Sequence, residues 1–562
     1  MYTEKSEKCV QPQNTNGYKR LLIVAEQYNC SGNMTDGSMA AAALLRLVYR
    51  SHLHLLLCLW AALVVCWCVS HWWQQQREEP LSRAPPPAAA VSSHYDLHPD
   101  DGRRSSPCLT ATFESRAHIY LGALRHAVQI MPLPAALGAV HVTHCARLRA
   151  EGVRPDISAH THALELHFPA VLREMSSSSS SSSSAAAAVD PLWRPGSVAE
   201  PLFYYVEALP YHVVYCTRKC DQKEDWSGRD AYWTRVAQHI VGNASFMKHM
   251  GKDYILPASH PQLGPGKIHP SSLSYLLRAS FLKTDFDISG GFPKDVIIPY
   301  YVPLDTDNDT DTDTDGSWCR NVSGNRPARP RLLFFAGSDN PRGGYRSLFL
   351  HRLEQALGAV AGTTRGHRRV LDRGGVYVSL TQLAGPRSPW WSSWRPSTLD
   401  GNGNERWYTR QMQETRFCLV LRGDTTSSKR FFTAVASGCV PVVVSDGLRL
   451  PFADAGLVDY STFALFFPES VVVAHGGIAR MLAMLRAVPE RTYRRMRCAL
   501  GAARRYLLYR RTNANSMTLS ELNPVTLALI ELLVRREKQC SSSGAPRPES
   551  LCATLLGRLT SR

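Results

Sequence analysis

The sequence predicts an α/β protein that contains a parallel sheet and follows a single apolar segment. The first observation is the stretch Phe417–Phe452, in which two short apolar runs flank a polar turn and a helix-like segment. A strand, a loop, a helix and a second strand in this order make one crossover of a parallel sheet. The second observation is the run Leu53–Val69, which is apolar and contains no acidic or strongly basic residue. The two observations predict a globular region behind one membrane span.

The crossover itself predicts a site for an anion. Phe417–Leu421 and Val440–Ser445 are the predicted strands, and Ser427–Ser437 is the predicted helix. Serines and threonines crowd the start of this helix, and Gly438 occupies the position of a C-terminal glycine. Loop amides and a helix N-terminus at the carboxyl end of a strand suit a diphosphate. An ordinary core crossover with polar loops is the alternative.

The order of residues in this stretch resembles the exostosin family of glycosyltransferases. Two positions depart from the family pattern, because Leu421 stands where the family has proline and Thr433 where it has an acid. The matching residues are Phe417–Leu419 (FCL), Gly423–Asp424 (GD), Ser427, Ser428 and Arg430 (SS-x-R), Gly438–Val442 (GCVPV), Asp446, and Leu450–Phe452 (LPF).

The resemblance extends over roughly residues 201–539. Tyr254 replaces a histidine of the family, which puts any role of that side chain in doubt. His118–Leu124, ahead of this region, is a candidate first strand. Further matching segments are Gly251–Asp253 with Ser259 and His260, Lys294–Pro299 (KDVIIP), Leu332–Ser338 (LLFFAGS) with the arginine Arg346 after it, and Asp459–Ser461 running to Glu469.

The resemblance implies two facing Rossmann-like domains of the GT-B type. Residues 108–330 are the expected acceptor-side domain, residues 331–540 the nucleotide-sugar-binding domain, and residues 541–562 a loose tail. Asp253 is a candidate catalytic base, and a structural acid that caps a turn is the alternative for it. The residues expected at the donor are Arg422, Gly423, Asp424, Ser427, Ser428, Arg430, Asp446 and Glu469.

The expected activity is that of an inverting hexosyl- or pentosyltransferase. It would move a sugar from a nucleotide sugar, with UDP as the expected nucleotide, to a glycan acceptor in protein glycosylation or polysaccharide synthesis. Arg430 and the helix start would stabilise the leaving diphosphate, so no metal or other cofactor is expected. A catalytically inactive, membrane-anchored glycan-binding or partner protein is the alternative.

Several other features bear on metals and partners. Within the acidic run Asp305–Gly316, the last six residues from Asp311 onward imitate the first half of a calcium loop. The twelfth position counted from Asp311 is Val322 rather than glutamate, so a solvated acidic loop is expected. The net charge of +17 over 562 residues favours anionic partners. The sequence contains no nucleic-acid-binding motif, so a nucleic acid is not expected among these partners. The fifteen cysteines define no zinc site. An oligomer with a related transferase is a further candidate partnership.

The apolar segment predicts a signal anchor over residues 47–73, between a cytosolic tail at 1–46 and a Pro/Ala-rich stem at 74–107. Arg46 and Arg50 precede the apolar core Leu53–Val69 and two glutamates follow it, so the bulk of the chain should face the lumen. The predicted location is the Golgi membrane, with single-pass type II topology. The sequons at Asn243 and Asn321 would then carry glycans. A cleaved signal peptide and a buried soluble helix are the alternatives.

Overall fold

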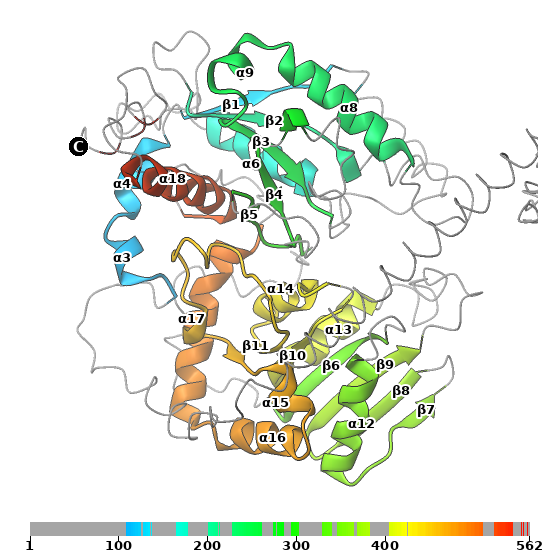
Figure 1. The fold of residues 1–562 in the computed structure, drawn as a ribbon. Helices are drawn as coiled ribbons and strands as arrows, with labels where there is room; N and C mark the ends of the chain where they lie inside the picture. Colours follow the sequence, from blue (N-terminus) through cyan, green and yellow to red (C-terminus); the bar gives the residue numbers. More distant parts are fainter. Residues whose placement is uncertain are drawn as a thin grey trace, which may run out of the picture. The chain divides into compact units, whose positions relative to one another are not determined.

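Two sheets, one from each half of the chain, carry the fold in the computed structural model of this protein (Figure 1). The structure describes residues 108–542 apart from 125–126, 135–136, 138–163, 178–200, 212, 214–226, 261–273, 277, 286–293, 303–328, 340–344, 365–367, 383–403, 424 and 510–521, and beyond them residues 552, 555 and 559. The predicted tail, anchor and stem, the run Asp305–Gly316 and the sequon at Asn321 lie outside these residues. Among the described residues no helix is long and apolar enough to cross a bilayer. Residues 102–562 form one compact unit.

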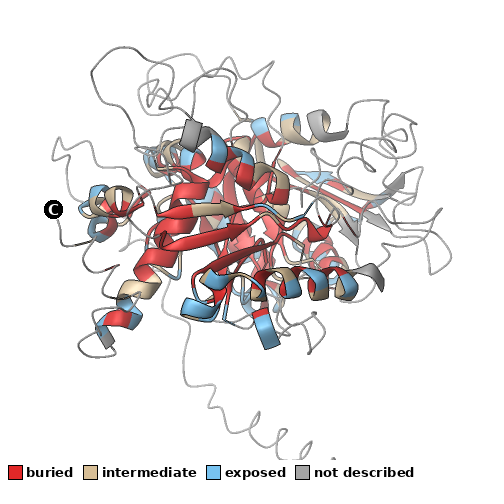
Figure 2. Ribbon diagram, turned by 90° about the horizontal axis from the view of Figure 1, so that it is seen from above, coloured by how far each residue is buried: buried red, intermediate tan, exposed pale blue. Residues whose placement is uncertain are grey.

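The N-terminal sheet has five parallel strands in the order β1-β2-β3-β4-β5. All residues of β2 to β5 are buried, as expected for a parallel sheet with both faces covered. Figure 2 shows buried residues concentrated on the strands, with exposed residues on the outer sides of the helices. The strands are β1 (Val128–Met131), β2 (Phe203–Val206), β3 (Tyr254–Ala258), β4 (Ser280–Lys283) and β5 (Val296–Ile297).

The candidate first strand at His118–Leu124 is wrong, because this segment forms helix α4 (Ala117–Ala123). Ala117, Tyr120 and Ala123 are buried at a spacing of three residues, which is the period of a helix rather than a strand. The other helices of this half are α3 (Ala111–Glu114), α6 (Leu164–Ser177), α8 (Ser227–Val241) and α9 (Ala244–His249). The sequon residue Asn243 is partly exposed and caps α9, where its Oδ1 accepts the Ser245 N–H at 3.1 Å.

The C-terminal sheet has seven strands in the order β12-β11-β10-β6-β9-β8-β7. The strands from β12 to β9 are parallel, and β8 and β7 form an antiparallel extension. β6 covers the predicted strand Leu332–Ser338, which confirms that prediction. The strands are β6 (Arg331–Asp339), β7 (Gly362–Thr364), β8 (Arg368–Arg373), β9 (Val376–Gln382), β10 (Thr415–Leu421), β11 (Val440–Val444) and β12 (Leu465–Phe466).

Two helices of this half, α16 (Gly477–Ala487) and α17 (Glu490–Leu507), are amphipathic. Both bury one apolar face, for example Leu482 in α16 and Leu500 in α17. The helices are α12 (Tyr345–Leu357), α13 (Asn404–Gln413), α14 (Lys429–Ala436), the short 3₁₀ helix η6 (Tyr460–Thr462), α15 (Glu469–Val473), α16 (Gly477–Ala487), α17 (Glu490–Leu507) and α18 (Pro524–Ser542).

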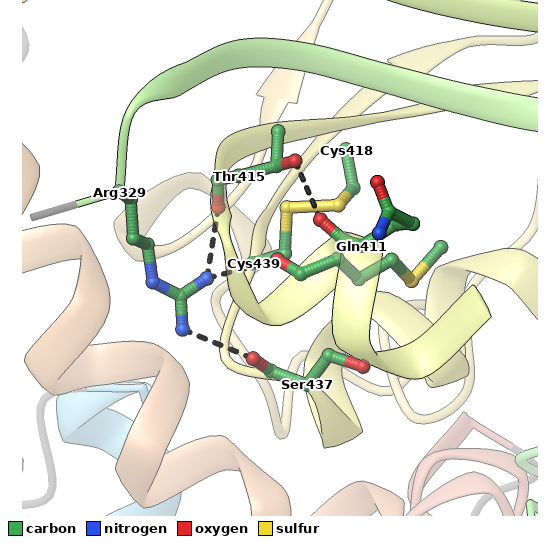
Figure 3. Close-up of a disulfide and its surroundings, with 7 residues drawn as sticks. Arg329, Gln411, Thr415, Cys418, Ser437 and Cys439 are labelled. Atoms are coloured by element: carbon green, nitrogen blue, oxygen red, sulfur yellow. Dashed lines mark hydrogen bonds between the residues drawn. A yellow bond between two sulfur atoms is a disulfide. The ribbon is translucent and has the colours of Figure 1, made fainter. Parts of the chain in front are cut away.

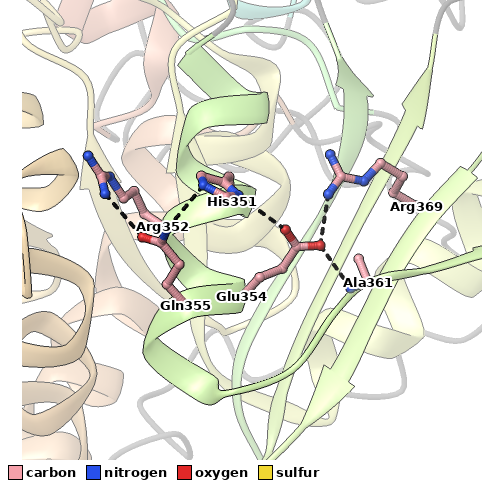
Figure 4. A network of polar contacts seen from close by, with 6 residues as sticks. All are labelled: His351, Arg352, Glu354, Gln355, Ala361 and Arg369. Atoms are coloured by element: carbon pink, nitrogen blue, oxygen red, sulfur yellow. Dashed lines mark hydrogen bonds and ion pairs between the residues drawn. The ribbon is translucent and has the colours of Figure 1, made fainter.

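A buried carboxylate attaches the antiparallel extension to α12 (Figure 4). Glu354 of α12 accepts the Ala361 N–H at 2.8 Å and pairs with Arg369 of β8 at 2.7 Å. Because Glu354 is only 8% exposed, these two donors compensate the cost of its desolvation. The network fixes α12, and with it the N-terminal residues of that helix, against the sheet.

Helix α18 packs against the N-terminal half, although the domain boundaries predicted above assign it to the C-terminal domain. It contacts β5, α4 and α6 as well as α17. Arg535 Nη1 donates to the carbonyl oxygen of Asp295 at 2.8 Å, just ahead of β5. Conversely, Leu109 of the N-terminal half forms a β-bridge with Val458 of the C-terminal half. The chain therefore crosses between the halves at both ends of the described region.

Glu531 of α18 is a buried acid within this crossing. It is 1% exposed and pairs with Arg535. Burial raises the pKa of Glu531 to about 7; Arg535 opposes this rise, and the nearby Asp454 adds to it. The folded protein therefore holds a proton on Glu531 at a pH where the unfolded chain, with a glutamate pKa of about 4.3, has lost it.

We predict that stability falls as the pH rises from about 4.3 to about 7, because folding must take up this proton in that range. The melting temperature of Glu531→Gln should change less between pH 5.5 and pH 7.5 than that of the wild type. Differential scanning fluorimetry of both proteins at the two pH values tests this. Equal pH dependence in the two proteins would exclude Glu531 as the source.

Candidate functional site

The predicted crossover forms with the expected elements, as β10, α14 and β11, and each boundary lies within two residues of the predicted one. β10 and β11 pair in parallel, with Phe417 opposite Val440 and Leu421 opposite Val444. Ser428 caps α14, because its side chain accepts the Arg430 N–H at 3.3 Å. Gly438 follows the helix with a φ of +63°, which glycine adopts without strain. These observations confirm the strand, helix and strand predicted for this stretch.

A disulfide joins the two ends of the crossover (Figure 3). Cys418 of β10 is bonded to Cys439, which precedes β11, and both are fully buried. Arg329 lies beside this bond and donates to the carbonyl oxygens of Thr415 at 2.8 Å and Ser437 at 3.1 Å. These contacts hold the amino end of β10 close to the end of α14. The sequence analysis did not pair these cysteines.

The topology predicts where a ligand binds on this sheet. After β6 the chain forms β7, β8 and β9, which all lie on one side of β6. The next strand, β10, lies on the other side of β6. The crevice at the carboxyl ends of two strands whose connections diverge is the usual binding site of an open α/β sheet. The expected site is therefore at the carboxyl ends of β6 and β10.

Three arginines meet at this position. Arg430 Nε donates to the carbonyl oxygen of Ala336 in β6 at 2.9 Å. Arg346 of α12 donates through Nε to the carbonyl oxygen of Arg422 at 2.9 Å. Arg430 and Arg346 both lie over the Phe335 ring, with Cζ 5.0 and 5.8 Å from its centroid. Arg422, just after β10, adds the third guanidinium.

Two glycines leave space for these guanidinium groups. A Cβ atom on Gly423 would lie 2.9 Å from Arg346 Nη2, which is too close for a van der Waals contact. A Cβ on Gly337 would clash with the guanidinium of Arg430. The arginines are therefore packed directly against the backbone of β6 and of the loop after β10. This packing fixes their position before any ligand arrives.

Asp446 and Glu469 form a reciprocal pair next to the arginines. The Asp446 N–H donates to Glu469 Oε1 at 2.8 Å, and the Glu469 N–H donates to Asp446 Oδ1 at 3.1 Å. Glu469 Oε2 lies 3.3 Å from Arg422 Nε. Burial raises the pKa of Glu469, whereas the Asp446 amide and Arg422 oppose the rise. Four of the eight predicted donor residues therefore lie at this end of the sheet: Arg422, Arg430, Asp446 and Glu469.

The predicted donor residue Ser427 has a different environment. Its hydroxyl donates to the carbonyl oxygen of Thr284, just after β4, at 3.2 Å. Phe432 of α14 packs against Tyr300, which belongs to the N-terminal half as Thr284 does, with 5.8 Å between the ring centroids. Ser427 therefore links the start of the crossover to the N-terminal sheet. Asp424 lies outside the described residues.

The candidate base Asp253 lies at the amino end of β3 and is fully buried. Its backbone carbonyl accepts the Tyr204 N–H at 2.8 Å, and its charge opposes the drop that burial causes in the pKa of Arg536. The N-terminal half contacts the crossover through Thr284, which follows the carboxyl end of β4. Asp253 lies at the opposite end of the neighbouring parallel strand β3. This position favours the structural alternative for Asp253. Two other carboxylates, Glu207 after β2 and Asp285 after β4, do follow the carboxyl ends of strands.

Sequence reasoning did not assign Arg346, Gly337 or Tyr345 to the site. Tyr345 belongs there because Arg422 Cζ lies 5.1 Å from the centroid of its ring. Arg346 was noted only as the arginine after the strand Leu332–Ser338, and nothing local indicated that it reaches Arg422. Within the described part of the chain, no group of three His, Cys, Asp or Glu side chains is placed to hold a metal ion. The expectation of a metal-independent site stays a prediction.

Comparison with known proteins identifies the family. Residues 207–482 match the model of the Exostosin GT47 domain. The "Probable arabinosyltransferase ARAD1" of Arabidopsis thaliana is 26% identical over 330 residues, which are 58% of this chain and 62% of that protein. "Exostosin-2" of Homo sapiens is 32% identical over 89 residues, which are 16% of this chain and 11% of that protein.

A "Probable glucuronosyltransferase" of Oryza sativa subsp. japonica is 31% identical over 118 residues, which are 21% of this chain and 25% of that protein. The matches to these relatives cover less than two thirds of each relative's length. The GT47 match contains β6, the crossover and the arginines described above. By this domain, the chain belongs to the exostosin family of glycosyltransferases.

Proposed function

We propose that this protein is an inverting glycosyltransferase that moves a sugar from a UDP-sugar to a glycan acceptor. The observation that carries the proposal is the meeting of Arg346, Arg422 and Arg430 at the carboxyl ends of β6 and β10. Guanidinium groups bind phosphate oxygens through charge-assisted, often bidentate hydrogen bonds. Their position at the topological switch point fits a nucleotide diphosphate.

The arginines would supply most of the catalytic stabilisation. As the bond between the sugar and the diphosphate breaks, negative charge grows on the leaving phosphate, and fixed cations there lower the barrier. Inversion also requires a base that takes the proton of the acceptor hydroxyl. The acceptor-side half would supply this base. Three guanidinium groups can balance the diphosphate charge without a metal.

The main alternative is a catalytically inactive, anchored glycan-binding or partner protein. Release of UDP by the purified chain distinguishes the two functions. We expect UDP release from at least one member of a panel of UDP-sugars, and equal release when EDTA is added. No release with any donor, alone or with candidate acceptors, would favour the inactive protein, and loss of release in EDTA would exclude a metal-independent site.

We also propose that the chain is a single-pass type II protein of the Golgi membrane. Arginines precede the apolar core of residues 47–73 and glutamates follow it, which supports a lumenal position of the globular region. Disulfides persist in such an oxidising compartment, and the globular region contains two of them, Cys418–Cys439 and Cys540–Cys552. Expression in eukaryotic cells followed by glycopeptide mapping should locate a glycan at Asn243 or Asn321. Asn29 and Asn33 also lie in sequons, but in the predicted cytosolic tail, so a glycan found only there would reverse the proposed topology.

Arg430 provides the sharpest test of the donor site. A charge-assisted contact contributes about 1.5–3 kcal/mol, so Arg430→Ala should weaken UDP binding roughly 10- to 150-fold. Arg430→Lys keeps the charge but loses the planar fork and should recover only part of the affinity. Isothermal titration calorimetry with UDP measures both effects.

Lys429 is the matched control, because it is the neighbouring cation at the start of α14. Lys429→Ala should change UDP affinity much less than Arg430→Ala. Since Arg430 also binds the Ala336 carbonyl, its loss could act through stability, and melting temperatures of all variants separate this effect. A folded Arg430→Ala protein with wild-type UDP affinity would refute the donor-site assignment.

A further inference from the structure

Tyr493, near the start of α17, carries a hydroxyl that the fold does not satisfy. Its side chain is 4% exposed, and its phenol oxygen is enclosed without a hydrogen-bond partner among the described residues. Buried hydroxyl groups almost always have a partner, so an exception requires an explanation. The Tyr493 ring packs edge-on against Phe417, with 5.6 Å between the ring centroids. The phenol therefore lies toward the amino end of β10, away from the proposed donor site.

Arg416 of β10 covers the same phenol with donors that are also unused. Its Cζ lies 4.5 Å from the centroid of the Tyr493 ring. Both Nε and Nη2 of Arg416 are enclosed, and neither forms a hydrogen bond within the described part of the chain. Nη2 lies 3.5 Å from Glu490 Oε2, which is an ion-pair distance. That carboxylate is 57% exposed and also pairs with Arg494, so Arg416 has only a shared, exposed counterion.

The charge that acts on the phenol oxygen is positive. Burial raises the pKa of Tyr493. The guanidinium groups of Arg329, Arg497 and Arg416 oppose the rise, and Glu490 adds to it. Arg329 is fixed in place by its hydrogen bonds to backbone carbonyl groups beside the disulfide (Figure 3). Three positive charges against one negative charge leave an excess of two around a hydroxyl that has no acceptor.

The start of α17 adds a second preference for an anion. Pro489 precedes the helix and provides no side-chain hydrogen bond to its first amides. Such amides and the aligned peptide dipoles make the N-terminus of a helix favourable for negative charge. Helical side chains lean toward the N-terminus of their own helix, so Tyr493 in the fourth position of α17 leans toward this positive end.

We propose that Tyr493, Arg416 and Arg497 bind a small tetrahedral dianion, sulfate or phosphate, either free or as the ester group of a larger molecule. The oxygen atoms of this anion would accept the hydrogen bonds of the phenol and of the Arg416 N–H groups. Its two negative charges match the local excess of two. The inference is independent of the proposed function, because no residue of the proposed donor site takes part.

The dianion would join two elements that are distant in the sequence. Arg416 belongs to β10, whereas Tyr493 and Arg497 belong to α17, which also packs against α14 of the crossover. A ligand that binds only the folded state stabilises it by mass action. Occupancy of this site should therefore raise the melting temperature.

Scanning fluorimetry of the purified chain tests this, with sodium sulfate or sodium phosphate exchanged for sodium chloride at constant ionic strength. We expect a saturating rise in melting temperature of roughly 2–5 °C with either dianion. Acetate, which carries one charge, should give little or no rise. Sulfate also stabilises proteins in general because it is excluded from their surface. That general effect does not saturate and is the same in all variants, so saturation identifies the site.

Two substitutions remove the proposed contacts, and each has a matched control. Arg416→Gln and Tyr493→Phe should each raise the sulfate concentration at half of the rise by roughly 10-fold or more. Arg410→Gln removes an arginine that forms an exposed ion pair with Glu414. Tyr509→Phe removes another buried phenol without a partner among the described residues, whose pKa is raised by burial rather than by neighbouring charges. Both controls should keep the wild-type response.

Sulfate can also bind arginines of the proposed donor site, and Arg430→Ala separates the two sites. The saturating rise should persist in this variant. A rise lost in Arg430→Ala but kept in Arg416→Gln would overturn the proposal, as would a response that is equal in all variants or does not saturate. A wild-type response in Tyr493→Phe would exclude the phenol from the site.

The source of the dianion is distinguished by a sulfate ester. N-acetylglucosamine 6-sulfate is compared with N-acetylglucosamine and with inorganic sulfate on the wild-type chain. Saturation by the ester at a lower concentration than by inorganic sulfate would identify a sulfated sugar as the ligand class. Saturation by inorganic sulfate alone would identify the free ion. No saturating response to any of these dianions would overturn the site.

Discussion

The parallel pairing of β10 with β6 on one side and β11 on the other is the constraint on which the candidate site depends. Because the three strands run in the same direction, the segments that follow them emerge at one edge of the sheet. The arginine cluster then forms from separate segments. Arg430 comes from α14, Arg346 from α12 and Arg422 from the end of β10. The hydrogen bond from Arg346 to the Arg422 carbonyl directly joins two of these segments.

The two ends of the central strands have different roles. At the amino end of β10, Arg329 binds carbonyl groups near the disulfide, and Tyr493 packs against Phe417. These contacts are internal and complete the core. At the carboxyl end, the guanidinium groups of Arg346, Arg422 and Arg430 lie close together. Such a concentration of polar groups costs stability in the absence of a ligand, which is the usual arrangement of a binding site.

The parts of the fold that could be predicted from the sequence depend on local patterns. Apolar runs of five residues, a serine-rich helix start and Gly438 specified the crossover, because strands, caps and glycine turns depend on adjacent residues. His118–Leu124 was misassigned because a short apolar segment fits a helix and a strand equally well. Arg346 and Tyr345 were missed as site residues for another reason. Their contacts with Arg422 join positions more than seventy residues apart, and no local pattern encodes that distance.

The exchange of segments between the halves has a consequence for biosynthesis. Helix α18, near the end of the chain, covers β5, α4 and α6, which are made much earlier. The ribosome releases the chain from the N-terminus, so the first sheet emerges long before the helix that completes its hydrophobic core. During that interval its apolar surface is uncovered, whereas the second sheet already has most of its own helices. The half that is translated first therefore completes its core last.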